Sequence, residues 1–347
     1  MFIINLSLKC IKYIFFLQLL YSNNISATEQ DFRSSPEVGT QNKNKSSIEY
    51  SKNFMVVCAD ERAASVAKKI LKLGGNAIDA AIAAQNVLSV VEPQSSGLGG
   101  GGFLIYYNKE QNILEAWDGR EVAPDNVSPN QYVDKKNNKI PFKKAITSPM
   151  SIGVPGLYSM LADVHKTNGK LAWEILFTDA ISYAESFEVS PRLNKMITWA
   201  HHIKNDEYSR KIYFENNIPK KVGSTVNNIK LAKSLNIISR NGYSINNGKI
   251  ANLIQKNLFP YITTKDLSDW RTIKRRPLCK KYKGYKICGF PPPTSGGFGV
   301  LQILSLVERF DTKFNYKNTI LDEHIFLEAS RLAYADRDIY IADPKFF

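Results

Sequence analysis

GGNAIDAAIAAQNVLSVVEP, residues 74–93, is the stretch of the sequence that decides the fold. Asn76 is placed to cap a helix, and Asp79 stands at the third helical position, where it completes the cap. The helix that follows is apolar on nearly every face, so we expect it to be buried between layers of structure. Pro93 ends this helix. If Asp79 is buried with the helix, its carboxylate must find hydrogen-bond partners.

The residues before this stretch predict a strand and a second helix. The apolar run Phe54–Ala59 is typical of a strand. Asp60 is a suitable N-cap for a helix that extends through Leu73 and has one apolar face. Gly74-Gly75 ends that helix, because a left-handed cap costs glycine little.

The residues after it begin with a run of glycines, GLGGGG at 97–102. By its letters the run fits the dinucleotide fingerprint G-x-G-x-x-G, but that fingerprint needs a strand before the glycines and a helix after them. Here a helix precedes the glycines, and the strand Phe103–Tyr107 follows. We therefore expect the glycines to let the backbone bend tightly or pass close to another segment. A second strand, Ile113–Trp117, completes a hairpin.

Apolar residues at helical spacing recur along the rest of the chain, with a second strand region at Leu278–Phe290. Together these patterns predict a mixed α+β protein. The predicted helices are 156–165, 173–186, 231–241, 298–310 and 321–340.

The N-terminus has the features of an export signal. Lys9 and Lys12 precede the apolar stretch Ile14–Leu20, and small residues follow near position 27. We interpret residues 1–27 as a signal peptide; a buried N-terminal helix is the alternative. Residues 28–53 are polar and are expected to form a disordered linker, so the ordered domain would be 54–347. The protein would then be periplasmic or secreted, with no stable membrane span after cleavage.

The chain of 347 residues carries a formal charge of +14, and 44% of its residues are hydrophobic. This composition is too apolar for general disorder and sufficient for a large core. The densest basic stretch is 274–286, in which Tyr282 and Tyr285 stand among the lysines. Elsewhere the lysines are scattered, and an exported protein rarely meets nucleic acid. A solvated basic face is therefore favoured over a nucleic-acid site.

Two cysteines lie symmetrically about a Lys-Gly turn in the stretch CKKYKGYKIC, residues 279–288. A two-residue loop in this hairpin sets Tyr282 opposite Tyr285 and Cys279 opposite Cys288, at a non-hydrogen-bonded pair. Such a pair is close enough for a disulfide. A register slip of one residue would instead leave two unpaired thiols.

Other chemistry-bearing residues are interpreted as structural. Thr294 and Ser295 have no identifiable base beside them and are read as packing and turn residues. Adjacent His201 and His202 cannot easily share one metal ion, and His324 with Glu328 suits a helix-surface hydrogen bond. No metal site or cofactor is predicted.

Several stretches, in this order and at this spacing, resemble the γ-glutamyltranspeptidase family. The resemblance runs from about Phe54 to the last residue. No single stretch is specific, but the ordered set is. The matching stretches are GGNAIDAA (74–81), VEP (91–93), SGLGGG (96–101), GREVAP (119–124), VPG (154–156), PPPTSGG (291–297), EA (328–329), ADR (335–337) and DP (343–344).

The resemblance implies an N-terminal-nucleophile hydrolase with a four-layer αββα sandwich, here incomplete because only the large-subunit portion is matched. Precursors of this family cut themselves into a large and a small subunit. The new N-terminal Thr of the small subunit attacks a γ-glutamyl amide such as glutathione, and the acyl group passes to water or an amino acid. The Thr-Thr-His segment that carries this nucleophile is not found in the sequence, so no catalytic residue is assigned, and a Thr-bearing small subunit is the expected partner.

Arg120 is the one substrate-binding residue that the resemblance assigns. In the family the arginine of this motif binds the α-carboxylate of the γ-glutamyl group, and a guanidinium is suited to grip a carboxylate through two hydrogen bonds. An ion pair with Asp118 or Glu121 is the structural alternative. Glutathione-cleaving members usually have Phe before this arginine, whereas Gly119 resembles a subgroup that includes acylase-like relatives.

Three functions therefore remain open from the sequence. The chain is half of a γ-glutamyltransferase or of an acylase-like relative, or a truncated and inactive remnant, or a protein that binds γ-glutamyl or other anionic ligands without chemistry. The remnant would expose apolar strand edges that the second half normally covers.

Overall fold

The computed structural model describes residues 48–241, 245–310 and 320–346. The predicted signal peptide, 1–27, and most of the predicted linker lie outside these residues; the described part of the linker, 48–53, is exposed. Within the described ranges, no helix combines the length and the apolar character needed to cross a membrane.

The first two helices form as predicted. Helix α2 (Glu61–Lys72) is capped by the Asp60 side chain, which accepts a hydrogen bond from the Arg62 backbone N–H. Helix α3 (Ala77–Val91) begins with a complete capping box formed by Asn76 and Asp79. Between the helices Gly74 has a φ of +89°, the left-handed conformation expected at a glycine cap.

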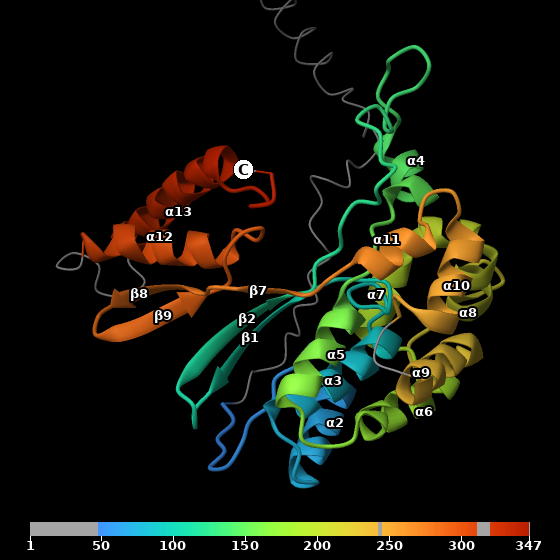
Figure 1. Cartoon of the computed structure of the whole chain (residues 1–347), viewed down its shortest axis with the longest axis horizontal. Coiled ribbons are helices and arrows are strands. Elements are labelled where there is room, and N and C mark those ends of the chain that lie inside the picture. Colours follow the sequence, from blue (N-terminus) through green and yellow to red (C-terminus); the bar gives the residue numbers. More distant parts are fainter. Residues whose placement is uncertain (1–47, 242–244, 311–319, 347) are drawn as a thin grey trace, which may run out of the picture.

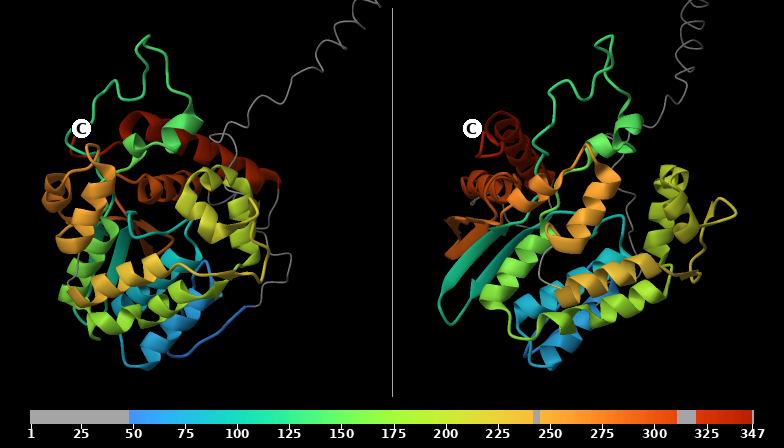
Figure 2. Two further views of the ribbon diagram at one scale, coloured as in Figure 1. Left: turned by 90° about the vertical axis from the view of Figure 1, so that its right-hand side faces the viewer. Right: turned by 45° about the vertical axis from the view of Figure 1, so that its right-hand side comes forward.

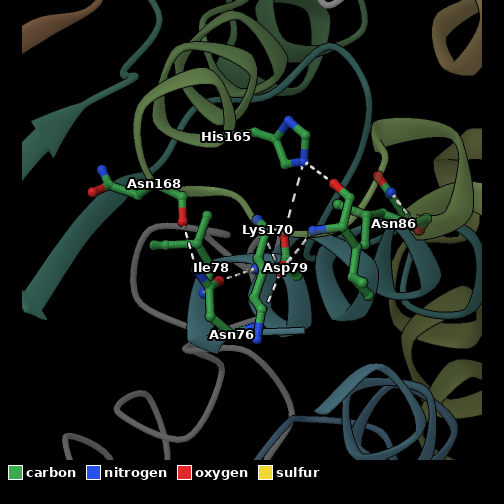
Figure 3. Close-up of polar contacts among 9 residues, drawn as sticks. Asn76, Ile78, Asp79, Asn86, His165, Asn168 and Lys170 are labelled. Carbon is green, nitrogen blue, oxygen red and sulfur yellow. Dashed lines mark hydrogen bonds and ion pairs between the residues drawn. The ribbon is translucent and has the colours of Figure 1, made fainter. Parts of the chain in front are cut away.

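Asp79 is fully buried, and its carboxylate is satisfied by backbone groups from two segments (Figure 3). The oxygens accept hydrogen bonds from the N–H of Asn76 at 2.9 Å, of Lys170 at 3.0 Å and of Leu171 at 3.3 Å. His165 Nε2 lies 3.7 Å from the carboxylate and donates to the Leu171 carbonyl at 2.9 Å. The partners expected for a buried Asp79 are therefore present, and they join the start of α3 to the turn at residues 168–171.

A three-stranded antiparallel sheet stands beside the helices, in the order β1 (Phe103–Asn108), β2 (Ile113–Asp118) and β7 (Ile273–Arg275). One face packs on the helical core through Leu104 and Trp117. The other face carries Ile105, which is 43% exposed, and Tyr107, which is 54% exposed. This second face is also the side on which β8 and β9 lie (Figure 1).

The helical body covers the first face of the sheet, with α5 nearest to it, α3 packed on α5 and α2 packed on α3 (Figure 1). The loop that precedes α4 projects from this body, whereas α6 and α9 pack together within it (Figure 2). The predicted helix 173–186 is divided into a 3₁₀ segment and α6. The elements are α4 (Phe142–Ile146), α5 (Leu157–Asn168), α6 (Thr178–Glu185), α7 (Pro191–Trp199), α8 (Glu207–Tyr213), α9 (Ile229–Asn241), α10 (Gly248–Leu258) and α11 (Thr264–Asp269), with 3₁₀ segments at Pro149–Ser151, Trp173–Phe177 and His201–Asn205.

The C-terminal elements form a smaller layered unit. Strands β8 (Leu278–Tyr282) and β9 (Tyr285–Gly289) pair as a hairpin, with α12 (Gly296–Glu308) and α13 (Ile320–Tyr340) over it (Figure 1). The class is α+β, as predicted. The order of helices, sheet, hairpin and helices is an incomplete αββα arrangement.

The run Phe54–Ala59 is not a strand, which corrects the prediction. The segment pairs with no strand in the part of the chain that the structure describes, and Val57 is 87% exposed. Its apolar side chains lie against α2 and α3 around a cavity of about 730 Å³. The sequence also gave no signal for the two-residue strands β3 (Phe187–Glu188), β4 (Phe214–Glu215), β5 (Ile218–Pro219) and β6 (Thr225–Val226).

Replacing the buried carboxylate should destabilise the whole helical body. We expect Asp79→Asn to lower the free energy of unfolding by about 2 kcal/mol or more, because an amide cannot satisfy all three backbone donors. The matched control is Asp269→Asn, whose side chain is 56% exposed and pairs with Lys265 on the surface, and which should change stability by less than about 0.5 kcal/mol. Urea denaturation of both variants makes the comparison; equal midpoints would contradict the role given to Asp79.

Candidate functional site

The glycine run connects α3 to β1 and brings three segments together. Gly102 and Gly119 exchange backbone hydrogen bonds of 3.2 and 2.9 Å, which extends the β1–β2 pairing. The Gly100 carbonyl accepts from the N–H of Gly156 at 3.2 Å and of Leu157 at 3.1 Å, at the start of α5. The expectation that these glycines allow close passage of the backbone is confirmed.

A cleft of about 740 Å³ lies along this run, and Phe103 and Glu121 are among its lining residues. The Glu121 carboxylate occupies the space that a side chain at Gly101 would need: a Cβ there would lie 2.3 Å from Glu121 Oε2. Gly99, by contrast, has open space around it. The absence of a side chain at Gly101 therefore leaves the space in which the Glu121 carboxylate packs against the loop.

Arg120 lies two residues after the end of β2, and hydrogen bonds hold its backbone N–H and its carbonyl. Its N–H donates to Asp118 Oδ1 at 2.9 Å, and its carbonyl accepts from Trp270 Nε1 at 3.1 Å. The guanidinium carbon lies 5.8 Å from the centroid of the Phe103 ring, within the range of a cation–π contact. Phe103 in turn packs on Phe290, with ring centroids 4.4 Å apart.

The ion pair considered as the structural alternative for Arg120 does not form. Asp118 is paired with Arg275, whose Nε lies 2.6 Å from Asp118 Oδ2. In the part of the chain that the structure describes, the guanidinium of Arg120 has no carboxylate partner. The Arg120 side chain is exposed, so it is available to an anion from outside.

A buried ion pair that the sequence did not reveal supports the loop before the glycines. Glu92, at the end of α3, is 1% exposed, and Arg192 Nε on α7 lies 2.7 Å from its Oε2. Burial raises the pKa of the Glu92 carboxyl even though Arg192 opposes that shift. Arg192 also donates to Ser95, which lines the cleft. These partners stand 100 residues apart in sequence, so no local pattern could indicate the contact.

The predicted motif at 291–297 forms a loop that leads into the start of α12 and packs against the end of β9. The Phe290 backbone and Gly289 lie against Gly297, where a Cβ would be 2.2 Å from the Phe290 carbonyl. Ser295 accepts a hydrogen bond from Arg337 Nε at 3.0 Å, and this contact links the loop to α13. Among the described residues, no group of three His, Cys, Asp or Glu side chains could hold a metal ion.

The β8–β9 hairpin has the predicted register, with Tyr282 opposite Tyr285 and Cys279 opposite Cys288. The turn residues Lys283 and Gly284 both have positive φ, +48° and +84°, as a two-residue hairpin loop requires. The Cα atoms of the two cysteines are 4.1 Å apart, and a disulfide joins their side chains. Cys58 is the free cysteine of the described residues.

This layered arrangement of helices, sheet, hairpin and helices is shared with solved gamma-glutamyltranspeptidases and is the fold of an N-terminal-nucleophile hydrolase. The family model for gamma-glutamyltranspeptidase matches residues 63–347, and the chain belongs to that family.

Individual relatives agree with this assignment. The glutathione hydrolase proenzyme of Escherichia coli is 35% identical over 302 residues, which cover 85% of this chain and 52% of the relative. The crystal structure of Helicobacter pylori gamma-glutamyltranspeptidase superposes with a TM-score of 0.82 at 32% identity, over 87% of this chain and 88% of that one. The cephalosporin acylase of Bacillus halodurans has a TM-score of 0.70 at 28% identity, over 88% of this chain and 59% of that one. The chain spans about half the length of the curated relatives it matches.

A methyl group at Gly101 should disturb the loop. We expect Gly101→Ala to lower the free energy of unfolding by about 1–3 kcal/mol, because Glu121 and its backbone must move to make room. Gly99→Ala adds the same methyl group in open space and should change stability by about 0.5 kcal/mol or less. Thermal unfolding measured by circular dichroism compares the two; a loss in Gly99→Ala as large as in Gly101→Ala would contradict the packing argument.

The cysteine pairing gives a second prediction. The predicted export and the observed register lead us to expect that proteolytic peptides carrying Cys279 and Cys288 stay linked until a reductant is added. The double variant Cys279→Ser/Cys288→Ser should lose about 2 kcal/mol of stability, and Cys58→Ser, the single-thiol control, should leave the linkage intact. Mass spectrometry after alkylation without reductant is the measurement; labelling of both hairpin cysteines would show that they are not bonded.

Proposed function

We propose that this chain is the large-subunit half of a γ-glutamyltransferase or glutathione hydrolase, which moves the γ-glutamyl group of glutathione or a related amide to water or an amino acid. The observation that carries the proposal is that, in a chain of this family, Arg120 has a held backbone and a guanidinium that no carboxylate of the described residues occupies.

Arg120 is proposed to bind the α-carboxylate of the γ-glutamyl group. A guanidinium presents parallel N–H groups that match the two oxygens of a carboxylate, so it fixes orientation as well as charge. The Phe103 ring beside it limits the directions that the side chain can take. With the carboxylate held at Arg120, the γ-carbonyl is presented at a fixed distance from this anchor to the attacking group.

The nucleophile is proposed to be the N-terminal Thr of a second, Thr-bearing half. Its hydroxyl attacks the γ-carbonyl while its own α-amine takes the hydroxyl proton. That proton passes to the nitrogen of the substrate amide, the C–N bond breaks, and the substrate's amine leaves. The resulting γ-glutamyl ester on Thr is then cleaved by water or by an amino acid. Support comes from the length relation, since the chain spans about half of its relatives, several of which are named proenzymes.

The exposed edge of β1 and the exposed apolar face of α13 offer a surface that such a partner could cover. Among the described strands β1 lies at the edge of its sheet and has an apolar outward face, and α13 exposes apolar side chains along much of its length. Strand edges and apolar faces of this kind are normally covered in a finished fold. The large apolar side chains that α13 exposes are Ile320, Leu321, Phe326, Leu327, Leu332, Tyr334, Ile339 and Tyr340.

The domain plan and location form part of the same proposal. Residues 1–27 would direct export and be removed, 28–53 would link, and 54–347 would form the large-subunit domain in the periplasm or outside the cell. A cross-strand disulfide at Cys279–Cys288 suits an oxidising compartment.

A second candidate, hydrolysis of another amide by an acylase-like enzyme, is favoured by Gly119. This residue is buried, and a Cβ here would lie 2.6 Å from Met160 Cβ, so the Phe usual in glutathione-cleaving members does not fit without displacing α5. Two p-nitroanilides distinguish the candidates: the γ-glutamyl compound carries an α-amine, and the glutaryl compound has the carboxylate without it. Preference for the glutaryl compound would favour the acylase.

The kinetic prediction concerns Arg120. We expect the chain alone to leave γ-glutamyl p-nitroanilide uncleaved, and the chain produced with its Thr-bearing half to cleave it. In that complex Arg120→Ala should raise KM about 10- to 100-fold, the loss expected for a charge-assisted contact of about 1.5–3 kcal/mol.

The matched control is Arg276→Ala, which removes an exposed arginine beside the same sheet and should leave KM unchanged. Cleavage by the chain alone would overturn the assignment of the nucleophile to a second half. An unchanged KM in Arg120→Ala would remove Arg120 from the substrate site.

A further inference from the structure

Two neighbouring cations on β7 each pair with a carboxylate of β2. Lys274 Nζ lies 3.0 Å from Glu115 Oε1, and Arg275 Nε lies 2.6 Å from Asp118 Oδ2. Successive residues of a strand point to opposite faces, so the two pairs stand on opposite sides of the sheet. Lys274 also covers the ring of Trp117, on the side of the helical core.

The Arg275 pair stands on the face that carries Phe103, the residue opposite Asp118 in the strand register. Asp118 is 5% exposed along its side chain, and both of its oxygens are engaged: Oδ1 accepts the Arg120 backbone N–H, and Oδ2 accepts Arg275 Nε. Two arginines thus adjoin one buried carboxylate. The guanidinium of Arg275 pairs with this carboxylate, whereas Arg120 contacts it only through its backbone N–H.

We propose that Arg275 is a positioning residue that keeps Arg120 available for a ligand. By occupying Asp118 it prevents this carboxylate from pairing with the guanidinium of Arg120, two residues away. A buried carboxylate that loses its cation strongly favours another, and Arg120 is the nearest arginine along the chain. The functional meaning of the inference rests on the proposed binding of a carboxylate by Arg120.

The test measures how fast Arg120 is modified by phenylglyoxal, a reagent that reacts with accessible arginine guanidinium groups and reacts more slowly with those held in an ion pair. The whole chain is used, and mass spectrometry resolves each arginine. In Arg275→Met the released Asp118 should pair with Arg120 and slow its modification about tenfold. Lys274→Met removes the neighbouring cation from the opposite face and should leave the rate at Arg120 unchanged.

Two further variants separate the electrostatic role from a structural one. Arg275→Lys keeps the cation beside Asp118 and should retain the rapid rate. The double variant Asp118→Asn/Arg275→Met removes the competing charge but keeps an oxygen for the Arg120 backbone N–H, so the rapid rate should return. Arg275 acting only as a structural residue would leave the double variant at least as perturbed as Arg275→Met, and that result, or an unchanged rate in Arg275→Met, overturns the inference.

A second arm keeps the inference separate from the proposed function. L-Glutamate, which carries the α-carboxylate, should protect Arg120 of the unsubstituted chain from phenylglyoxal, and Arg276, the exposed control, should not be protected. Absence of protection counts against the proposed function, whereas the variant rates decide the role of Arg275. Protection together with equal rates in all variants would overturn the inference alone.

Discussion

The buried carboxylate of Asp79 is the constraint on which the rest of the structure depends. Helix α3 runs through the core and is buried along most of its length, and its N-terminus would otherwise leave backbone donors unsatisfied in an apolar interior. Asp79 satisfies the cap of its own helix and two donors of the turn after α5. The direction of α3 is thereby fixed, and its far end leads to the glycine run at 97–102 that borders the cleft.

The sequence predicted the elements that local rules determine. The caps at Asp60 and Asn76, the β1–β2 hairpin and the register of β8–β9 all follow from a few adjacent residues. The prediction of a strand at Phe54–Ala59 was wrong because an apolar run does not show whether a partner strand exists. The sequence did not predict helices α7, α8, α10 and α11. These helices are short, and they form through tertiary packing rather than through a long apolar periodicity.

For the candidate site, the sequence led to Arg120 through a family motif but could not supply its surroundings. Trp270 contacts Arg120 across 150 positions, and Arg275 contacts Asp118 across 157. Contacts over such separations leave no periodicity to read, so the competition between two arginines for one carboxylate becomes visible only in three dimensions. The same holds for the support that Arg192 gives to Glu92.

Strand β7 is only three residues long, yet its two faces make different contacts. On one face Lys274 pairs with Glu115 and covers the core residue Trp117, and on the other face Arg275 pairs with Asp118. A single insertion or deletion between Trp270 and the strand would exchange these faces, turning the long guanidinium toward Trp117 and the lysine toward Asp118. For these two pairings, the number of residues in this short connection therefore matters more than their chemical character.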